Sequence, residues 1–483
     1  MRYLQQMGEC SMACHYDCFF INGVWVKPHS DDVISLENPA TGEVFAHVPD
    51  GTPEDVANAI EAAAQAQPAW AATPLCQRIE RMQKALEIFR TYREEIIRLE
   101  ALELGSPVSF SANSHCDYQF TRIESYIQEC KNVPLKENFE QSTVVREPVG
   151  VVACITPWNY PLGQVVQKVI PALLMGNTVV LKPSQHTPLT SYLLVDSLDQ
   201  AGFPPGTVNL VTGRGSRLGD TLATHPLVDM ISFTGSTNVG IKLSQKALGT
   251  LKRISLELGG KSPFIWLPSQ DYAPAVDKLF SSIFYNSGQT CTALSRLLVP
   301  EEDLDQIKSL LLSRVSELTV GDPMNPNTKI GPMASRAQYE KVLAYIELGQ
   351  KEGAELLCGG AAPEAGSGYY IKPTIFTGVT NDMRIAREEI FGPVLCVITY
   401  RSLDEAVAIA NDTVYGLSAA VYGERSLALD VASRLKSGNV YVNGAPRDVT
   451  APLGGYKQSG IGREGGRYGL MEFTQLKAVF DRC

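Results

Sequence analysis

The feature of this chain that most constrains its fold is an alternation of short apolar runs and amphipathic segments that begins near Val149. The runs VGVVACIT, NTVVLKP, TVNLVTG and VDMISFTG are rich in β-branched residues, and helix-like stretches from Pro161 and from Thr187 separate the first three. Short β-branched strands with helices between them are typical of βαβ units, whose parallel sheet is buried on both faces. We therefore predict an α/β fold with an open sheet of the dinucleotide-binding type.

A second region of the same kind follows Cys291 and predicts a second open α/β domain. The length of 483 residues also exceeds what one compact core usually holds. The expected elements of this region are helices at 302–318, 335–353, 403–410 and 426–435 and a strand at 394–400. Upstream, residues 53–104 predict two long helices, the first starting at the sequence TPED and the second covering 77–104.

Charge and apolar content exclude several classes of partner. The formal net charge is −10 and no cluster of Lys and Arg occurs, which argues against a surface for nucleic acid or for anionic membranes. The longest apolar runs fall short of the roughly 20 residues that cross a bilayer. The N-terminus also lacks the apolar segment of a secretory signal. We therefore expect a globular, cytoplasmic protein.

The 11 cysteines give no disulfide framework, because their number is odd and their spacing irregular. One tight group consists of Cys10, Cys14 and Cys18, with His15 beside them. Such a group could hold a metal, but it lacks the paired Cys-x-x-Cys elbows of many zinc sites. We prefer a loose N-terminal extension and expect no metal site.

A nucleotide site needs glycine where a phosphate approaches the backbone. The fingerprint G-x-G-x-x-G between strand and helix is absent, and the nearest pattern, at 213–219, has the wrong last spacing. A better candidate is ISFTGSTNVG at 231–240, where a strand ends and a helix begins, leaving free N–H groups for a phosphate. Ordinary capping of that helix explains the pattern at least equally well.

Three polar side chains lie at the ends of apolar strands, where open α/β sheets bind ligands. Lys182 lies in VVLKPSQ, Glu257 in ISLELGGKSP and Asn159 in the stiff turn TPWNYP. As functional groups they would be a cofactor ligand, a general base whose pKa is raised by desolvation, and a donor to an oxyanion. Each also allows a second interpretation: a solvated lysine, a paired structural carboxylate and a turn-capping amide.

Cys291 lies in NSGQTCTALSR, after an amphipathic run at 271–285. A loop cysteine with a base and amide donors in reach can attack a carbonyl carbon as a thiolate. Nothing within the segment itself separates Cys291 from the other cysteines, so its interpretation depends on the base and the amide.

Taken together, these segments closely resemble the aldehyde dehydrogenase superfamily over nearly the whole chain, from residue 20 to residue 480. The motifs that carry the resemblance are TPWNYP, LKPS, FTGSTNVG, LELGGKSP, GQTC, EEIFGPV and PLGGYKQSGIGREGG, in the family's order and spacing. By similarity, Cys291 would be the nucleophile that forms a thiohemiacetal with an aldehyde. Asn159 would hold the oxyanion, and Glu257 would activate the water that hydrolyses the resulting thioester.

The resemblance implies that NAD(P) is the cofactor. Lys182 would contact the adenosine ribose, residues 235–240 the pyrophosphate, Glu389 the nicotinamide ribose and Phe391 the nicotinamide ring. Many NAD-preferring members carry Glu where this chain has Gln185, so a 2′-phosphate would meet less repulsion here and the choice between NAD and NADP stays open. The expected cofactor residues are Ile155, Thr156, Trp158, Lys182, Ser184, Gln185, Phe233, Gly235, Ser236, Gly240, Leu258, Glu389 and Phe391.

The resemblance also points to the wall of the aldehyde tunnel, which in members that oxidise aliphatic aldehydes is often apolar or aromatic. The polar lining here favours a polar or anionic aldehyde, and Arg447 could pair with the carboxylate of a semialdehyde. The alternative is that Arg447 is solvated on a loop. Lys168 matches a lysine for which a proton-relay role is conceivable. The expected substrate residues are Tyr160, Gln164, Gln167, Thr290, Thr292, Arg447 and Leu453.

By similarity the chain divides into three parts. A Rossmann-like NAD(P)-binding domain would comprise residues 1–122 and 147–257, and a catalytic domain residues 258–455. A small β oligomerisation element would comprise residues 123–146 and 456–483. Its runs STVVREPV and FTQLKAVF could form an edge hairpin and a strand that are shared between the subunits of a homodimer or homotetramer.

The expected reaction is the NAD(P)-dependent oxidation of an aldehyde to a carboxylate without CoA. One alternative is the CoA-acylating branch of the family, which usually lacks the base at the position of Glu257. The other alternative is a catalytically silent relative that acts as a binding protein, and the intact set of Cys, Glu and Asn argues against it.

Overall fold

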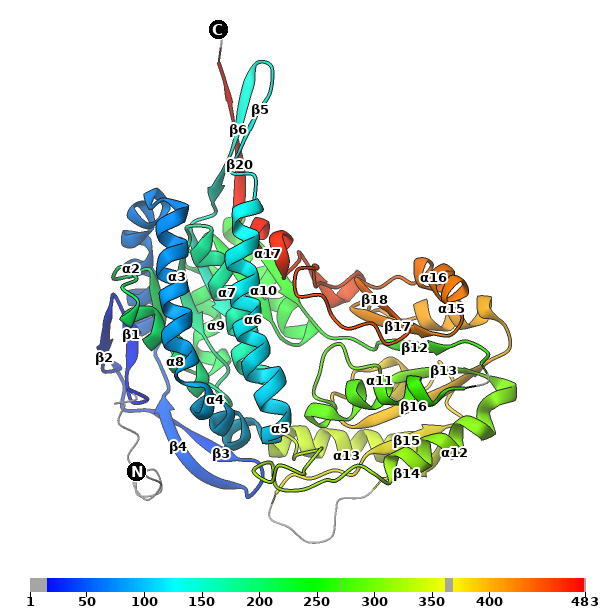
Figure 1. The fold of residues 1–483 in the computed structure, drawn as a ribbon. Coiled ribbons are helices and arrows are strands. Elements are labelled where there is room, and N and C mark those ends of the chain that lie inside the picture. The colour runs from blue at the N-terminus through cyan, green and yellow to red at the C-terminus, as the bar shows by residue number, and fades with distance from the viewer. Residues whose placement is uncertain (1–14, 270, 361–367, 482–483) are drawn as a thin grey trace.

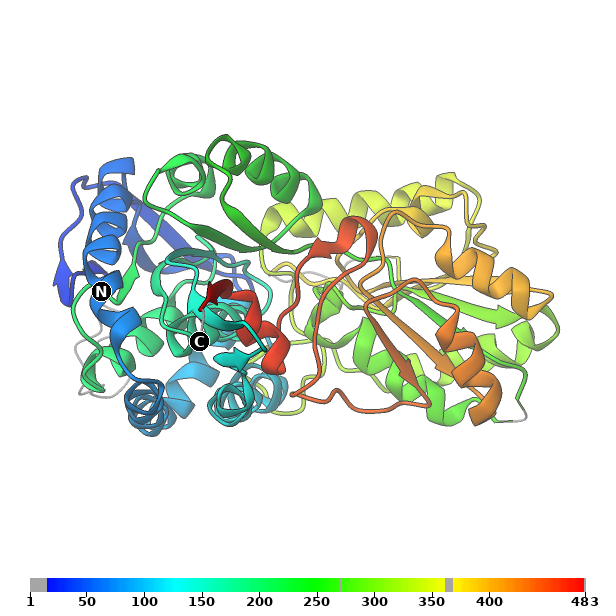
Figure 2. The same cartoon turned by 90° about the horizontal axis from the view of Figure 1, so that it is seen from above.

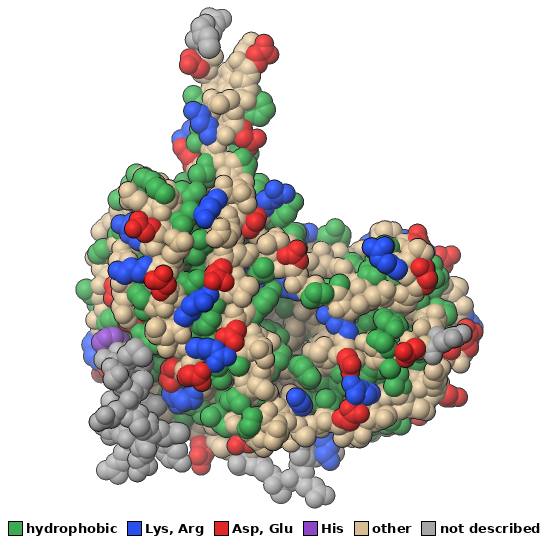
Figure 3. All heavy atoms as spheres, viewed as in Figure 1, with side chains coloured by type: hydrophobic (Ala, Val, Ile, Leu, Met, Phe, Trp, Pro, Cys, Tyr) green, Lys and Arg blue, Asp and Glu red, His purple; other side chains and the backbone are tan. Residues whose placement is uncertain are grey.

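The computed structural model describes residues 15–269, 271–360 and 368–481 of the chain. Two large open sheets lie side by side, each flanked by helices, and a narrow three-stranded sheet projects from one end (Figure 1). Seen from above, the C-terminal segment drawn in red runs between the two halves (Figure 2). The surface is hollowed between these halves (Figure 3). The predicted α/β class, with two open α/β halves and a small β element, is confirmed.

The first sheet has the strand order β19-β11-β10-β7-β8-β9-β1-β2, and its central strands are parallel. These central strands are the predicted apolar runs, and burial on both faces explains their continuous apolar character. They are β7 (Val151–Ile155), β8 (Thr178–Lys182), β9 (Val208–Leu210), β10 (Met230–Thr234) and β11 (Arg253–Glu257). Antiparallel strands form the edges: β1 (Phe19–Ile21), β2 (Val24–Val26) and β19 (Gly460–Ile461).

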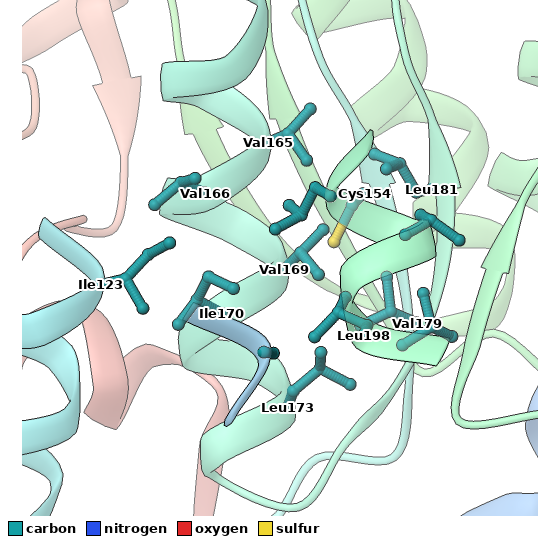
Figure 4. Packing of buried hydrophobic residues seen from close by; sticks show 14 of the residues in the cluster. Ile123, Cys154, Val165, Val166, Val169, Ile170, Leu173, Val179, Leu181 and Leu198 are labelled. Atoms are coloured by element: carbon teal, nitrogen blue, oxygen red, sulfur yellow. The ribbon is translucent and has the colours of Figure 1, made fainter. Parts of the chain in front are cut away.

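Helices cover both faces of the first sheet, and α7 (Pro161–Leu174) is buried along its whole length. Figure 4 shows Val165 and Val169 of α7 packed beside Cys154 and Leu181 of the strands. Each such side chain contributes about 1.5–3 kcal/mol by burial, which holds α7 rigidly on the sheet. The other helices of this half include α2 (Pro53–Ala72), α8 (Leu189–Gln200), α9 (Gly215–Thr224) and α10 (Thr237–Ala247).

Of the two long helices expected over 53–104, the first is confirmed as α2 and the second is wrong as a single element. Residues 77–104 are instead divided among α3 (Leu75–Arg90), α4 (Arg93–Leu99) and a π-helical turn, Glu100–Leu104. The break occurs because the Thr91 hydroxyl donates to the Ile88 carbonyl (2.6 Å) and Tyr92 turns into the core. Then follow α5 (Val108–Phe110), a second π-helical segment, Ser111–Asp117, and α6 (Tyr118–Glu129).

The second sheet has the order β14-β15-β16-β13-β12-β17-β18 and is parallel except at β14. Its strands are β12 (Pro263–Trp266), β13 (Arg296–Pro300), β14 (Glu355–Cys358), β15 (Thr374–Thr377), β16 (Val394–Tyr400), β17 (Ser418–Tyr422) and β18 (Asn439–Val442). Its longer helices are α11 (Ala273–Ile283), α12 (Leu304–Val315), α13 (Arg336–Lys351), α15 (Leu403–Asn411) and α16 (Arg425–Ser433). The predicted strand and helices of this region are confirmed, with helix bounds that differ by a few residues.

The third sheet forms the arm at the top of Figure 1. Its antiparallel strands are β5 (Lys136–Asn138), β6 (Ser142–Pro148) and β20 (Thr474–Phe480), so the predicted hairpin and C-terminal strand do lie together. Sharing of this arm between subunits stays a prediction, as do the domain boundaries. The pair Gly460–Ile461, expected in the oligomerisation element, joins the first sheet as β19.

Near the N-terminus, β3 (Val33–Asn38) and β4 (Glu43–Pro49) form a separate hairpin. Cys10 and Cys14 lie outside the described residues, and Cys18 is buried with a free thiol. Within the described ranges, no group of three or more His, Cys, Asp or Glu side chains is suited to hold a metal. Nor does any helix in that part of the chain combine the length and apolar character needed to cross a membrane.

Candidate active site

The carboxyl ends of four parallel strands bring together polar residues expected from the sequence. Ile155, at the end of β7, is the register partner of Lys182 at the end of β8. On the other side of β7, Thr234 ends β10 opposite Glu257, which ends β11. This edge of an open α/β sheet is where ligands bind. The expected cofactor residues Ile155, Thr156, Ser184, Phe233 and Leu258 are all buried around it.

The loop that carries Cys291 has a backbone conformation that few residues adopt. It follows the 3-10 turn Tyr285–Gly288, in which Asn286 and Ser287 have φ angles of 51° and 54°. Left-handed geometry costs a non-glycine residue about 1–2 kcal/mol, so neighbouring groups must hold it. The Asn286 amide does so by donating to the backbone carbonyl of Asn159 (2.9 Å). The nucleophile loop is thereby fixed to the strand ends of the other half.

The Cys291 thiol is only partly exposed, and its surroundings disfavour the thiolate. Burial raises its pKa to about 12, and the charges of Glu257 and Glu389 act in the same direction. At neutral pH the thiol therefore keeps its proton until a base removes it. The effect of Glu257 on this pKa also shows that the predicted base lies near the predicted nucleophile.

Asn159 is buried, and its side-chain amide donates to the backbone carbonyl of Gln289 (2.9 Å). Together with the bond from Asn286 to the Asn159 carbonyl, this makes a reciprocal link between the TPWNYP turn and the nucleophile loop. An amide nitrogen has two N–H groups. Use of one by Gln289 leaves the second for an oxygen bound beside Cys291.

Glu257 is 4% exposed, and among the described residues its Oε1 atom has no hydrogen-bond partner. Burial raises the pKa of this carboxyl well above its usual value, and the charge of Glu464 raises it further. The cations Lys168, Arg463 and Arg447 oppose that shift. A buried carboxyl with a raised pKa is suited to act as a general base near neutral pH.

Glu464 is a buried residue that the sequence interpretation missed. Its carboxylate pairs with the buried Lys168 ammonium, and its second oxygen accepts a hydrogen bond from Gln167 Nε2 (2.7 Å). Backbone bonds to Leu453 in both directions (2.6 and 2.7 Å) hold Glu464 in place. Within the motif PLGGYKQSGIGREGG the available signal was a lone acidic residue among glycines, which does not by itself indicate burial.

A cavity of about 530 Å³ opens beside Cys291, in the hollow between the two halves (Figure 3). It brings together all of the substrate residues expected from the sequence: Tyr160, Gln164, Gln167, Thr290, Thr292, Arg447 and Leu453. The charged side chains of its lining are Arg122, Lys278 and Arg447, with no carboxylate among them. Further lining residues that the sequence interpretation missed are Phe110, Asn113, Tyr118, Gln119 and Tyr441.

Two of these cations are free to meet an anion. Within the described ranges Arg447 and Lys278 have no carboxylate partner, and the Lys278 ammonium lies over the Tyr441 ring (5.0 Å). Arg122 instead donates to Gln119 Oε1 (2.7 Å) and to the Gly163 carbonyl (3.2 Å). The cavity is therefore polar and positively charged.

The expected adenosine end of the cofactor site is formed around β8. The Lys182 ammonium donates to the backbone carbonyls of Pro183 (2.8 Å) and Gly213 (3.1 Å), which leaves one of its three N–H groups for a ligand. Burial lowers the pKa of Lys182 to about 8. Gln185 is partly exposed nearby and brings no charge.

The expected nicotinamide end is formed by residues of both halves. The rings of Trp158 and Phe391 meet edge to face with centroids 5.4 Å apart, and Phe391 has a φ angle of 63°. Glu389 accepts a hydrogen bond from the Gly260 N–H (2.9 Å), and burial raises the pKa of its carboxyl. These aromatic and carboxyl groups suit a flat ring and ribose hydroxyls.

At the start of α10, Ser236 caps the helix by accepting a hydrogen bond from the Val239 N–H (3.4 Å). A Cβ atom at Gly235 would lie 2.4 Å from the Phe233 ring, and one at Gly240 would lie 2.6 Å from Leu258. Helix capping and packing thus explain these residues on their own. Their contact with a pyrophosphate stays a prediction.

Comparisons with known proteins identify the family of the chain. A model of the aldehyde dehydrogenase family matches residues 25–479. The chain is 45% identical over 468 residues to 3-succinoylsemialdehyde-pyridine dehydrogenase of a Pseudomonas species, covering 96% of this chain and 98% of that one. A crystal structure of a mutant of aldehyde dehydrogenase C from Pseudomonas syringae, complexed with NAD+ and octanal, is 42% identical with a TM-score of 0.95, covering 96% and 97% of the two chains. Aldehyde dehydrogenase of Mycobacterium tuberculosis complexed with NAD+ is 39% identical with a TM-score of 0.94, covering 97% and 98%.

The fold and these similarities define the class of the protein as a nicotinamide-dependent oxidoreductase. The chain belongs to the aldehyde dehydrogenase family, as its motifs predicted. The roles of the individual side chains, and the aldehyde that is oxidised, stay predictions.

Proposed function

We propose that the protein oxidises an aldehyde to the carboxylate with NAD(P) and water, through a covalent bond to Cys291. The observation that carries the proposal is the convergence of a nucleophile, an amide and a base from three different elements. The Cys291 loop is hydrogen-bonded to Asn159, and the charge of Glu257, whose Oε1 atom has no hydrogen-bond partner among the described residues, raises the pKa of the thiol. These are the groups that acyl-transfer chemistry on a thiol needs.

In the first half of the proposed reaction, Cys291 Sγ loses its proton to a base and bonds to the aldehyde carbon. The aldehyde oxygen becomes an oxyanion, which the second Asn159 N–H and the backbone N–H of Cys291 stabilise. NAD(P), when bound, supplies the acceptor for the hydride on that carbon. Departure of the hydride restores the carbonyl and leaves a thioester on Cys291.

In the second half, Glu257 removes a proton from water, whose oxygen bonds to the thioester carbon. The carbon–sulfur bond then breaks, and the products are the carboxylate and the Cys291 thiol. The raised pKa of Glu257 makes it a stronger base than an exposed glutamate. Glu464 and Lys168 form a buried ion pair whose charges act on that pKa.

Two alternatives lead to different products. A CoA-acylating enzyme would release an acyl-CoA, and the buried base at Glu257 favours water instead. A silent relative would bind the cofactor without turnover. An aldehyde panel with NAD and with NADP, each with and without CoA, separates these two alternatives from our proposal. We expect NAD(P)H and free acid in the absence of CoA. Strict dependence on CoA, or binding of the cofactor without turnover, would contradict the proposal.

For the substrate we propose a polar aldehyde, specifically a semialdehyde whose second polar group meets Arg447. The support is the cavity lining, which carries cations and no carboxylate, together with the similarity to a protein named for a semialdehyde. A similar structure holds octanal, an apolar aldehyde, so the panel should pair semialdehydes with plain aldehydes of equal chain length.

For the cofactor we propose NAD, with NADP also accepted. Several similar structures are complexed with NAD+, which supports the first part. The second rests on Gln185, which lacks the charge that would repel a 2′-phosphate, and on the free N–H of Lys182. The ratio of kcat/KM for the two cofactors tests both parts.

We also propose a homodimer or homotetramer in the cytoplasm, assembled through the arm of β5, β6 and β20. Leu476 and Phe480 on this arm are 62% and 80% exposed, more than apolar side chains usually are unless a partner covers them. The described cysteines are all free, as in a reducing compartment. Light scattering of the full chain, and fractionation of the cells that make it, test the two statements.

A further inference from the structure

Behind the wall of the substrate cavity lies a cluster of buried ionisable groups that the proposed mechanism does not use. It consists of Glu100, Glu103 and His115, each at most 1% exposed. Glu100 and Glu103 lie on the π-helical turn Glu100–Leu104, and His115 lies on the π-helical segment Ser111–Asp117. π-helical turns are rare and occur frequently at functional sites.

The ionisable side chains of this cluster are buried, and burial favours their neutral forms. It raises the pKa of Glu100 well above its usual value and that of Glu103 to about 8, and it lowers the pKa of His115 to about 3. His115 Nδ1 lies 3.5 Å from Glu100 Oε2. Among the described residues neither of these two atoms has a hydrogen-bond partner, and a neutral imidazole beside a neutral carboxyl places no net charge under the cavity.

The His115 ring reaches the active site through one neighbour. It stacks on the Tyr160 ring, with centroids 4.9 Å apart and an interplanar angle of 27°. The Tyr160 hydroxyl is hydrogen-bonded to Thr290 Oγ1 (3.0 Å), and Thr290 precedes Cys291. A chain of contacts therefore runs from Glu100 through two stacked rings to the residue before the nucleophile.

The same cluster lies beside the start of α7, which directly follows the proposed oxyanion donor Asn159. Tyr160 is the N-cap residue of α7, and the Leu162 backbone acts on the Glu100 carboxyl. Asn286, which fixes the Asn159 carbonyl, acts in turn on the His115 ring. His115 thus stacks on Tyr160, which follows Asn159, and Asn286 of the Cys291 loop is among the groups that act on its pKa.

We propose that the buried His115 is a positioning residue: its ring packs on Tyr160 and fixes it, and through Tyr160 it fixes Thr290 and the thiol of Cys291 beside it. This inference rests on the proposed function, because it assumes that Cys291 is the nucleophile. Small displacements of reacting groups change rates strongly, so loss of the ring should lower reactivity at Cys291 while leaving cofactor binding unchanged.

The first test compares His115→Ala, His115→Phe and Cys116→Ala in the full chain. Cys116 is an equally buried neighbour that contacts the Arg93 carbonyl and serves as the matched control. We expect His115→Ala to lower both kcat and the rate of Cys291 alkylation by iodoacetamide about tenfold. His115→Phe keeps a ring on Tyr160 and should recover both rates, while Cys116→Ala and the Kd for NAD should match wild type.

The second test asks whether the effect passes through Tyr160. In a double-mutant cycle, His115→Ala should lower the alkylation rate in the wild-type background but have no further effect once Tyr160→Leu is present. Tyr160→Phe, which keeps the ring and loses the hydroxyl, should lower the rate as well. This variant removes only the Tyr160 hydroxyl, so it tests the link from Tyr160 to Thr290 even where the His115 variants are poorly folded.

Independent, multiplying effects of His115→Ala and Tyr160→Leu would overturn the inference. So would a His115→Ala protein that loses thermal stability but keeps wild-type alkylation and kcat, because His115 would then be only structural. Failure of the proposed function gives a different result: Cys291→Ala would retain turnover. If Cys291→Ala is inactive and His115→Ala is unimpaired, the proposed function stands and only the positioning role is lost.

Discussion

The buried ammonium of Lys168, on α7, forms an ion pair with the buried carboxylate of Glu464, 296 residues later in the chain. Such a pair is costly to remove from water and depends on further hydrogen bonds, which Gln167 supplies here. After burial, the charge of Glu464 is the largest cause of the raised pKa of Glu257. The pair therefore influences the protonation of the proposed base.

Replacing Glu464 with Gln removes this negative charge and keeps the shape of the side chain. We expect the pKa of Glu257 to fall, because a charge that raises it is gone and Lys168 acts unopposed. A general base works only when it is deprotonated, so thioester hydrolysis should reach its plateau at a lower pH than in wild type. The acid limb of the kcat profile measures this shift.

The matched control is Glu472→Gln, at a partly buried glutamate of α17 (Gly466–Glu472) that is not among the groups acting on the pKa of Glu257. Its acid limb should stay at the wild-type position. Glu464→Gln should also destabilise the fold by about 3–5 kcal/mol in urea, because it leaves Lys168 buried without a partner. If the acid limb of the kcat profile does not move in Glu464→Gln, the charge of Glu464 does not set the pKa of Glu257.

Glu257→Gln should separate the two halves of the reaction. The amide cannot accept the proton from water, so we expect one rapid burst of NADH per active site followed by turnover that is slower by about 10²- to 10⁴-fold. Stopped-flow absorbance measures the burst, and intact-protein mass spectrometry detects the acyl group on Cys291. Steady turnover at the wild-type rate without acylated enzyme would remove Glu257 from the mechanism.

Arg447→Leu tests the proposed substrate class. A charge-assisted hydrogen bond is worth about 1.5–3 kcal/mol, so kcat/KM for succinic semialdehyde should fall about ten- to hundredfold further than that for butanal. Any change for butanal reports the loss of the Arg447 charge that acts on Glu257. Arg401→Leu is the control, at an exposed arginine that pairs with Glu301 away from the cavity. An equal loss for both aldehydes would mean that Arg447 supports the fold and does not select the substrate.

Gln185→Glu tests the cofactor preference. The new carboxylate would accept hydrogen bonds from the ribose hydroxyls of NAD and repel the 2′-phosphate of NADP. We expect the ratio of kcat/KM for NAD over NADP to rise by about tenfold or more. Gln185→Asn, in which the side chain stays neutral, should leave the ratio near that of wild type. A similar ratio in wild type and both variants would mean that residue 185 does not discriminate between NAD and NADP.

Much of the fold could be predicted from the sequence because strand and helix patterns are local. The apolar runs ending at Ile155, Lys182 and Glu257 are strands because both faces of the sheet are buried, and the polar last residues Lys182 and Glu257 mark the ligand edge. The break at Thr91 was missed because apolar spacing continues through it, and the turn shows only in the hydrogen bonds that the Thr91 N–H and hydroxyl donate to the Ile88 carbonyl.

The parts of the site that were missed depend on contacts between distant segments. The influence of Glu464 on Glu257 follows from its burial and its ion pair with Lys168 of α7. Such a contact between distant segments leaves no periodic pattern in the sequence. The same holds for His115, whose π-helical segment has helix-like spacing and whose function follows only from its stack on Tyr160. Cys291 itself could be singled out only through the family motifs, because its own segment resembles an ordinary loop.

The central claim, a covalent reaction at Cys291, is tested most directly by comparing Cys291→Ala with Cys358→Ala, a second partly buried cysteine with a free thiol. NADH formation and the mass of the intact protein are followed after mixing with aldehyde and NAD. We predict that Cys358→Ala forms NADH and carries the acyl group as wild type does, and that Cys291→Ala does neither while still binding NAD. Turnover by Cys291→Ala at the wild-type rate would contradict the account.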